Sequence, residues 1–299
     1  MAHSPLIPVI VNSSGGTASA QGDRLAERLN AGFVAAGMAI DLRLIDPGDL
    51  DHQLDRVTGA PLVVVGGGDG TLGRAAGVLA RSGSTLGILP LGTRNHLAAQ
   101  LGIPDDLDDA ARVIAAGRRM RMDLGSAGGR VFINNASVGL YSRLVLARER
   151  MPGPKWLGTL PAAWHVLHRL HAQLLDLSIG GTRRSLRTPL LFIGNNRYAL
   201  DRGRLGQRDS LADGELSFYA VAPRTPLQLL AMALRIMTGR ADPARDFLAL
   251  TSAPSARIGG TGRMEIALDG EVDHLPLPLE FRCLPQALEV IVPAESLFS

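Results

Sequence analysis

Leu62-Val63-Val64-Val65-Gly66-Gly67-Gly68-Asp69-Gly70-Thr71 is the stretch of sequence that decides the fold. Its first four residues form an apolar, mostly β-branched run, which is typical of a parallel strand buried on both faces. The glycines that follow let backbone N–H groups approach an anion closely, because no Cβ stands in the way. Open α/β sheets bind ligands at the carboxyl ends of their strands, so this stretch predicts a phosphate-binding turn.

Asp69 is the charged residue of this turn. A carboxylate and a phosphate repel each other, so Asp69 is not expected to cradle the phosphate itself. We expect it instead to position Mg²⁺ or to handle a proton. The turn is therefore interpreted as a nucleotide site equipped for chemistry, with a purely structural glycine turn as the alternative.

Two better-known phosphate loops fit the sequence less well. Lys155 is the only lysine of the chain and no G-x-x-x-x-G-K-[ST] motif occurs, which excludes a P-loop lysine. Gly68-x-Gly70-x-x-Gly73 matches the dinucleotide fingerprint, but that fingerprint also needs an acidic residue about 20 positions later, at a strand end. The chain has Ile88-Leu89-Pro90-Leu91-Gly92-Thr93 there, without an acid, so the dehydrogenase interpretation is disfavoured.

The residues around this stretch alternate between strand and helix patterns, and the pattern changes near residue 122. The first part predicts strands over 6–11, 39–45, 62–65 and 86–90, helices over 23–37, 71–82, 95–101 and 106–117, and a turn at Pro47-Gly48. The second part predicts short strands over 131–136, 174–179, 189–194, 215–221, 257–267 and 288–292, with helical stretches over 157–175 and 227–237. We therefore predict a three-layer α/β N-terminal domain with a parallel sheet, followed by a β-rich, sandwich-like C-terminal domain.

A second motif, Pro90-Leu91-Gly92-Thr93-Arg94-Asn95, follows the next apolar run. Together with Gly66–Thr71 it resembles lipid kinases with the diacylglycerol kinase catalytic domain, a family that also includes sphingosine and ceramide kinases. Three further segments resemble the family's landmarks in order: Val11–Gly16, Asp213-Gly214-Glu215-Leu216 and Leu268-Asp269-Gly270-Glu271. The resemblance extends over nearly the whole chain, from about residue 7 to residue 290.

The resemblance implies a fold of the NAD kinase/diacylglycerol kinase type, with a cleft between two domains. It divides the chain into a nucleotide-binding α/β domain (1–122), a β-rich domain (123–280) and a terminal segment (281–299). This terminal segment is expected to return to the first domain, which the hydrophobic pattern alone does not predict.

ATP-dependent phosphoryl transfer requires groups that hold the phosphates and a base near the attacking hydroxyl. We expect backbone and hydroxyl contacts to the nucleotide from Gly66, Gly67, Gly68, Gly70 and Thr71, and short polar contacts from Asn12, Thr93 and Asn95. Asp69 is expected to act in catalysis, and by resemblance Glu271 is the general base that accepts the proton of the lipid hydroxyl. A surface acid in a hairpin turn is the alternative for Glu271, because Asp-Gly is a common hairpin turn.

Bacterial relatives in this family hold a structural Mg²⁺ at the place of Asp213, and the matching positions beside it are Ser210 and Glu215. Mg²⁺ prefers oxygen ligands and keeps several waters, so one carboxylate with nearby oxygens suffices. An ordinary turn is the alternative for this segment.

The composition is typical of a soluble, cytoplasmic enzyme, and the resemblance implies a lipid substrate at a membrane surface, with ATP and Mg²⁺ as cofactors. The chain has 299 residues, a formal net charge of +3, and a single cysteine, Cys283, which cannot form an internal disulfide. No apolar run reaches the 18 or so residues of a transmembrane segment, and Met1–Pro5 lacks the basic start of a signal peptide. A nucleic-acid partner is not expected; peripheral association with the inner face of the membrane and a homodimer stay open.

Two departures from the family pattern leave other functions open. His96 stands where many members have an acid, and Ile45 stands where relatives often have a nucleotide-contacting threonine. A nucleotide- or lipid-binding module without turnover is therefore one alternative to the lipid kinase. An NAD kinase, which shares G-G-D-G-T, is another, although Pro90–Asn95 matches the lipid kinases.

Overall fold

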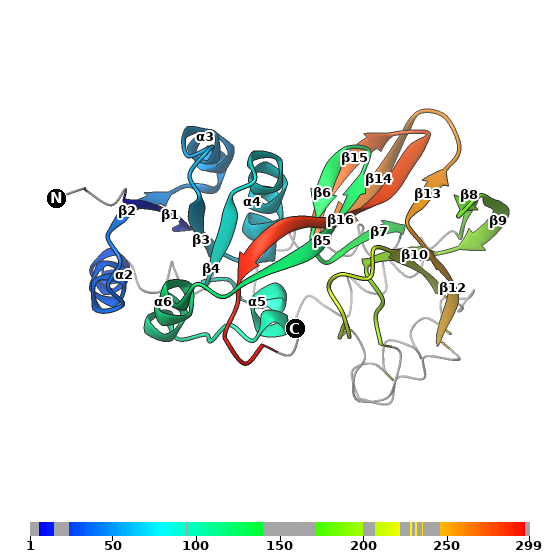
Figure 1. Cartoon of the computed structure of the whole chain (residues 1–299). Helices are drawn as coiled ribbons and strands as arrows, with labels where there is room; N and C mark the ends of the chain where they lie inside the picture. Colours follow the sequence, from blue (N-terminus) through cyan, green and yellow to red (C-terminus); the bar gives the residue numbers. More distant parts are fainter. Residues whose placement is uncertain are drawn as a thin grey trace. The chain divides into compact units, whose positions relative to one another are not determined.

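The computed structural model describes residues 6–14, 24–93, 95–139, 172–199, 207–221 and 246–296, together with Gln228, Ala231 and Arg235. The chain forms two compact units, and each consists of segments that are distant in the sequence (Figure 1). Unit 1 comprises residues 1–124, 131–133 and 284–299, and unit 2 comprises residues 125–130 and 134–283.

Unit 1 contains a parallel sheet whose strands follow the order β2-β1-β3-β4-β16. The strands are β1 (Ile7–Asn12), β2 (Ile40–Ile45), β3 (Leu62–Gly67), β4 (Thr85–Pro90) and the C-terminal part of β16 (Leu279–Ile291). The central strands are apolar throughout: Val63, Val64 and Val65 are fully buried. A strand buried on both faces requires layers above and below it, and helices supply both.

The helices of unit 1 pack in pairs on the sheet: α2 lies against α6, and α3 lies against α4 (Figure 1). Their bounds are α2 (Arg24–Ala35), α3 (Leu50–Arg56), α4 (Asp69–Ser82), α5 (His96–Leu101) and α6 (Leu107–Ala116), with a 3₁₀ turn η1 at Pro47–Asp49. In α2, the buried residues Leu25, Leu29 and Phe33 recur every four positions and form the face that meets the core. The predicted α/β class with a parallel sheet is confirmed.

Two predictions for unit 1 need correction. Pro47-Gly48 does not simply turn the chain; it opens η1, which continues into the unpredicted helix α3, where only Leu50 and Leu54 are buried. Two buried positions give too weak a periodic signal for a helix to be recognised in the sequence. The second correction is that α4 begins at Asp69 rather than at Thr71, and β3 runs on through Gly66 and Gly67.

The C-terminal strand β16 joins unit 1 by its last residues, where Val290 pairs with Leu86 of β4. The Thr85 hydroxyl donates a 2.5 Å hydrogen bond to Glu289, and Arg119 lies 3.0 Å from the same carboxylate. These contacts hold the pKa of Glu289 below its usual range, with the hydrogen bond from Thr85 as the largest cause. β16 is thus held against β4 by a side-chain hydrogen bond as well as by strand pairing.

Unit 2 is built mainly of antiparallel strands in two sheets. One has the order β12-β11-β10-β7-β14-β15, with strands β7 (Asn135–Gly139), β10 (Leu190–Asn195), β11 (Leu216–Val221), β12 (Phe247–Ala253), β14 (Arg263–Leu268) and β15 (Glu271–Pro276). The other pairs the N-terminal part of β16 with β13 (Ser255–Ile258), β8 (Gln173–Ile179) and β9 (Thr182–Thr188). β5 (Arg119–Ala127) pairs with β16 and with β6 (Arg130–Phe132). The predicted β-rich character of this part is confirmed.

Several strand predictions in the second part of the chain were wrong in extent. The run 131–136 contains two strands, β6 and β7, and the run 257–267 contains β13 and β14, which belong to different sheets. The glycines at 259, 260 and 262 separate the latter two, and Gly260 and Gly262 have positive φ angles. β9 was not predicted, because its sequence Thr182–Thr188 carries three arginines and little apolar alternation. β5, β12 and β15 were likewise missed.

Two predicted helical stretches lie largely outside the described residues. The described end of the stretch 157–175 is strand rather than helix, since Leu174 and Leu175 belong to β8. Of the stretch 227–237, only Gln228, Ala231 and Arg235 are described, and all three are helical. None of the helices in the described residues combines the length and the apolar character that crossing a bilayer requires.

Candidate active site

The polar residues predicted for the nucleotide site lie at the carboxyl ends of three neighbouring strands of unit 1. The parallel register pairs Val11 of β1 with Gly66 of β3, and pairs Gly67 of β3 with Pro90 of β4. The residues that follow these strands therefore leave the sheet at the same edge. Asn12, the Gly68–Thr71 turn and the Leu91–Asn95 loop are brought together at this edge, as the sequence predicts.

Asp69 connects two of these loops. It is the first residue of α4, and its two carboxylate oxygens accept hydrogen bonds from the backbone N–H groups of His96 (3.1 Å) and Leu97 (3.0 Å). These are two of the N–H groups that α5 leaves without partners inside the helix. The carboxylate thus stabilises the N-terminus of α5 and fixes the Pro90–Asn95 loop beside the glycine turn, a role that the sequence did not reveal.

The two loops touch through glycines. A Cβ built on Gly92 would lie 2.3 Å from the Cα of Gly68 and 3.0 Å from its backbone nitrogen. Both atoms are backbone, so no side-chain movement could relieve such a clash. Gly92 is therefore required by the packing of one loop against the other, whatever it contributes to phosphate binding, whereas a Cβ on Gly68 would make a tight contact of 3.3 Å with the Cα of Gly92.

We predict that Gly92→Ala lowers both stability and activity, because the added methyl group must push the two loops apart. Overpacking of this kind typically costs about 1–3 kcal/mol. We expect a fall of several degrees in the melting temperature, measured by circular dichroism, and at least a tenfold loss of the catalytic activity that the sequence predicts. Gly48→Ala is the matched control, since its Cβ would meet no atom within 4 Å. Equal effects of the two substitutions would contradict the packing role of Gly92.

Gly66 and Gly67 lie in the last residues of β3, where a side chain has no room. A Cβ on Gly66 would lie 2.8 Å from Leu91 and 2.9 Å from Val11, and one on Gly67 would lie 2.7 Å from Thr71. Packing alone therefore accounts for both glycines. The first backbone N–H groups of α4 lie at the N-terminus of this helix, where an anion could accept from those of Gly70 and Thr71.

Asparagine side chains hold the remaining loops in shape. Asn12 donates to the hydroxyl of Thr71 at 3.1 Å and accepts from the Ser14 N–H at 3.1 Å. Asn95 has a positive φ of 47°, accepts from the Gly92 N–H at 2.8 Å and donates to the Pro90 carbonyl at 3.3 Å. These bonds order the site from within. Of the other predicted nucleotide contacts, Gly70 is half-buried in the first turn of α4 and Thr93 is exposed on the loop.

Glu271 lies in unit 2, directly after the turn between β14 and β15. Leu268 pairs with Glu271, and the two residues between them, Asp269 and Gly270, have φ angles of +49° and +93°. This is the two-residue hairpin turn that Asp-Gly favours. Glu271 is exposed to solvent. Its position agrees with the hairpin alternative and equally leaves its carboxylate accessible to a substrate.

Buried polar residues that the sequence analysis missed fix this turn. The Asp269 carboxylate accepts from the N–H groups of Asn134 (2.7 Å) and Asn135 (3.2 Å). Arg208, which is 3% exposed, donates to the Asn134 side chain at 3.0 Å, and the Tyr198 hydroxyl donates to the Asn134 carbonyl at 2.9 Å. Burial raises the pKa of Tyr198.

The sequence feature that could have predicted this network is a pair of Asn-Asn dipeptides, at 134–135 and 195–196. Each follows an apolar run, where buried polar side chains need partners. Asn195 and Asn196 are fully buried. The Asn196 side chain also accepts from the Asp213 N–H at 3.2 Å, so the network reaches the predicted metal segment.

The predicted metal ligands share one loop of unit 2 but do not form a compact acidic cluster. Asp213 is exposed, the Ser210 hydroxyl accepts from the Ala212 N–H, and Glu215 lies 3.4 Å from Arg197. Among the described residues, no group of three His, Cys, Asp or Glu side chains is arranged to hold a metal. The atoms that could coordinate a metal here are oxygens, which Mg²⁺ prefers as ligands, and water would complete its coordination.

Comparisons with known proteins show which family and which fold the chain shares. Residues 7–127 match the diacylglycerol kinase catalytic domain. A protein of Pseudomonas syringae pv. syringae named "Probable lipid kinase YegS-like" is 30% identical over 273 residues, which cover 87% of this chain and 86% of the relative. A protein of the same name from Pseudomonas aeruginosa is 32% identical over 249 residues, covering 80% of this chain and 78% of the relative.

The solved structure of a diacylglycerol kinase from Bacillus anthracis has the same fold, with a TM-score of 0.69 and 20% identity, and covers 99% of this chain and 100% of that one. An α/β unit with glycine-rich strand ends and a β-rich unit are thus the fold that this chain shares with that protein. The chain belongs to the family of lipid kinases with a diacylglycerol kinase catalytic domain.

Proposed function

We propose that this protein transfers the γ-phosphate of ATP to a hydroxyl group of diacylglycerol or a related lipid. The observation that carries the proposal is the junction of the glycine turn and the Pro90–Asn95 loop, which Asp69 fixes through the N-terminus of α5. This junction orders backbone donors around a carboxylate at the carboxyl end of a parallel sheet. Membership of the lipid kinase family supports the same reaction class.

The proposed reaction needs little covalent participation by the protein. The lipid hydroxyl oxygen forms a bond to the γ-phosphorus, the bond to the β,γ-bridging oxygen breaks, and ADP leaves with that electron pair. Glu271 accepts the proton of the lipid hydroxyl. The N–H groups of Gly70 and Thr71 bind the nucleotide phosphates, with Asn12, Thr93 and Asn95 supporting them. Mg²⁺, held with the help of Asp69, would neutralise phosphate charge.

The direct test is incubation with labelled ATP, Mg²⁺ and a panel of lipids dispersed in detergent. We expect labelled phosphatidic acid, or the phosphorylated form of a related lipid. Nucleotide binding in a calorimeter without label in any lipid would favour a binding module over an enzyme. Formation of labelled NADP from NAD would instead favour an NAD kinase.

We also propose that Asp213, together with Ser210 and Glu215, binds a structural Mg²⁺. If so, Mg²⁺ without nucleotide should stabilise the protein by about 2.7 kcal/mol at a hundredfold excess over Kd. The measurement is the melting temperature with increasing Mg²⁺, and Asp213→Asn should lose most of the rise. Asp176→Asn, which removes another exposed carboxylate of unit 2, is the control and should keep it. An identical Mg²⁺ response in all three proteins would leave Asp213 as an ordinary turn residue.

A further inference from the structure

Arginines gather on the solvent face of one sheet of unit 2. The register places Arg257 of β13 opposite Ser178 of β8, and Ser178 opposite Arg183 of β9. Farther along the same hairpin, Arg187 lies opposite Leu174. Directly paired residues share one face of a sheet, and all four of these large side chains are exposed. Leu174, with 74% of its surface exposed, adds an apolar residue to this face.

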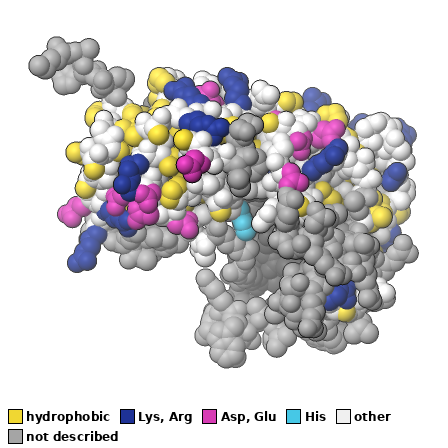
Figure 2. Space-filling view, turned by 60° about the horizontal axis from the view of Figure 1, so that its bottom comes forward, with side chains coloured by type: hydrophobic (Ala, Val, Ile, Leu, Met, Phe, Trp, Pro, Cys, Tyr) yellow, Lys and Arg dark blue, Asp and Glu magenta, His cyan; other side chains and the backbone are white. Residues whose placement is uncertain are grey.

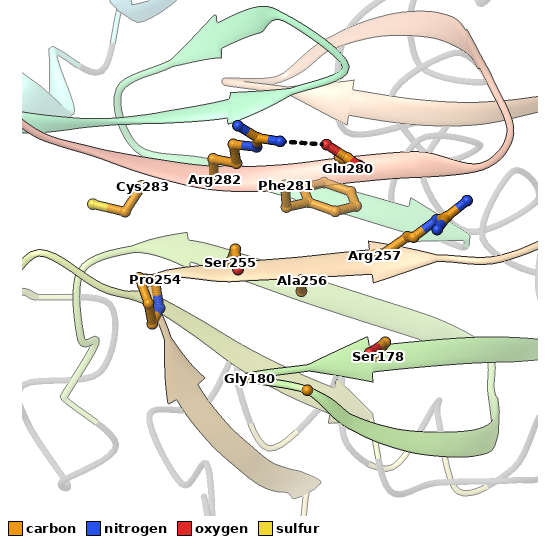
Figure 3. Close-up of a pocket in the computed structure, with 11 residues that line it drawn as sticks. Ser178, Gly180, Pro254, Ser255, Ala256, Arg257, Glu280, Phe281, Arg282 and Cys283 are labelled. Atoms are coloured by element: carbon orange, nitrogen blue, oxygen red, sulfur yellow. Dashed lines mark hydrogen bonds and ion pairs between the residues drawn. The ribbon is translucent and has the colours of Figure 1, made fainter.

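The N-terminal part of β16 extends the face. Arg282 lies opposite Ser255, and Glu280 lies opposite Arg257. Figure 3 shows Glu280 and Arg282 on the same side of β16, joined by an ion pair of 2.9 Å. We call the solvent-facing residues of these four strands the basic sheet face: Leu174, Asp176, Ser178, Arg183, Ser185, Arg187, Ser255, Arg257, Glu280 and Arg282.

Positive charge is in excess on the basic sheet face. Its four arginines outnumber its two acids, Asp176 and Glu280, by two charges. Arg183, Arg187 and Arg257 form no ion pair with any described residue, so their charge is available to a partner. Figure 2 shows one face of the protein, on which basic and acidic side chains are interspersed over the described surface.

A pocket opens among the same residues. Its volume is about 350 Å³, and Ser178, Ser255, Arg257 and Arg282 belong to its lining (Figure 3). A pocket of this size can hold a small polar group such as a phosphate-bearing lipid headgroup. The guanidinium group of Arg257 and two hydroxyls are suited to phosphate oxygens. Glu280 also lines the pocket and is paired with Arg282, so Arg282 would have to share its guanidinium group between Glu280 and a phosphate.

We propose that the basic sheet face binds the surface of a membrane rich in anionic phospholipids, with one headgroup phosphate in the pocket between Arg257 and Arg282. This inference rests on the proposed function, because a lipid kinase must reach a substrate that lies in a bilayer. Charge complementarity supplies the attraction, and Leu174 supplies an apolar contact at the headgroup level. The basic sheet face is thus the surface by which the protein contacts the membrane that contains its substrate.

Protection of a sheet edge and binding of nucleic acid would each account for only some of these features. Exposed edge strands often carry basic residues that prevent aggregation, and β9 lies at the end of its sheet. That role does not require Arg257 on the inner strand β13 or a pocket beside it. Nucleic-acid binding would also use arginines, but single-stranded recognition uses aromatic stacking, and the basic sheet face has no aromatic residue.

The test measures sedimentation of the protein with vesicles, without ATP. We expect binding to phosphatidylcholine vesicles that contain one third phosphatidylglycerol, little binding to pure phosphatidylcholine, and weaker binding as salt rises. Each arginine near an anionic surface increases affinity for the membrane about fivefold. The double variant Arg183→Gln/Arg257→Gln, which removes two of them, should therefore bind vesicles roughly 25-fold more weakly. Arg24→Gln/Arg56→Gln removes the same charge from exposed positions on α2 and α3 and should leave binding within about twofold.

A readout of phosphorylation separates this inference from the proposed function. In detergent micelles without anionic lipid, both double variants should phosphorylate lipid at the wild-type rate. Equal vesicle binding by the two variants would overturn the docking face, as would arginine-dependent binding of a DNA oligonucleotide without binding to vesicles. Aggregation of Arg183→Gln/Arg257→Gln in sedimentation velocity, with vesicle binding unchanged, would show that the arginines only protect the edge. If the wild-type protein phosphorylates no lipid in detergent micelles, the proposed function is overturned instead.

Discussion

Replacing Asp69 by asparagine is expected to reduce lipid phosphorylation by roughly a thousandfold while the protein remains folded. Asparagine keeps the size of the side chain and can still accept a hydrogen bond from the N-terminus of α5, so the loop junction survives in large part. What it removes is the negative charge that positions Mg²⁺ or a proton. The measurement is the initial rate of transfer from labelled ATP to lipid in detergent micelles, together with a thermal melt.

The chain offers a control for the capping role in an aspartate that also forms an ion pair of 2.7 Å with Arg28. Asp106 caps α6 by accepting from the N–H groups of Asp108 (3.0 Å) and Asp109 (3.1 Å), nearly the same bonds that Asp69 makes to α5. Asp106→Asn should change the melting temperature about as much as Asp69→Asn and leave phosphorylation nearly unchanged. If Asp69→Asn retains activity within a fewfold of wild type, Asp69 is a helix cap and not a catalytic residue.

Glu271→Gln is expected to lower phosphorylation by about a hundredfold to ten-thousandfold, the usual contribution of a positioned base. Stability should hardly change, because the side chain is exposed and the turn is fixed by Asp269 rather than by Glu271. The rate should be measured at saturating ATP and lipid, so that kcat is separated from binding. The melting temperature checks that the fold is retained.

Asp273→Asn is the matched control for Glu271→Gln. Asp273 lies on the same strand, and its carboxylate is 3.2 Å from Arg130, so its loss removes a charge and one ion pair. It should keep most of the activity. The double variant Asp69→Asn/Glu271→Gln adds a further test: two groups that serve one step give a combined loss smaller than the product of the single losses. A fully multiplicative loss would mean that the two carboxylates act independently.

The sequence predicted the elements whose burial is regular and missed those held by long-range pairing. β3 and α2 show their periodicity in a few residues, because one face or both faces meet the core. β9 has a single buried position, Thr188, and β8 is its only partner among the strands that the structure describes, so its local sequence carries no strand signal. The division of the run 257–267 depends on glycine φ angles and on which sheet each half joins, neither of which the hydrophobic pattern contains.

In the candidate site, too, the sequence predicted what depends on local pattern and missed the contacts between distant segments. The order of parallel strands sufficed to predict that Asn12, Asp69 and Asn95 lie at one edge of the sheet. It did not predict that Asp69 caps α5, that Gly68 touches Gly92, or that Asp269 fixes the turn before Glu271. Each of these contacts joins segments that are distant in the chain, and one sequence does not reveal which distant partner a polar side chain will find.

Because β16 supplies residues to both units, no single cleavage of the polypeptide yields either unit complete. A fragment that stops near residue 124 retains the glycine turn and the Pro90–Asn95 loop, yet it lacks Val290 beside Leu86 and Glu289 bonded to Thr85. During synthesis on the ribosome, the sheet that carries those turns therefore stays unfinished until β16 has emerged. A stop codon anywhere before β16 should leave that sheet without its strand beside β4, however much of the preceding chain is made.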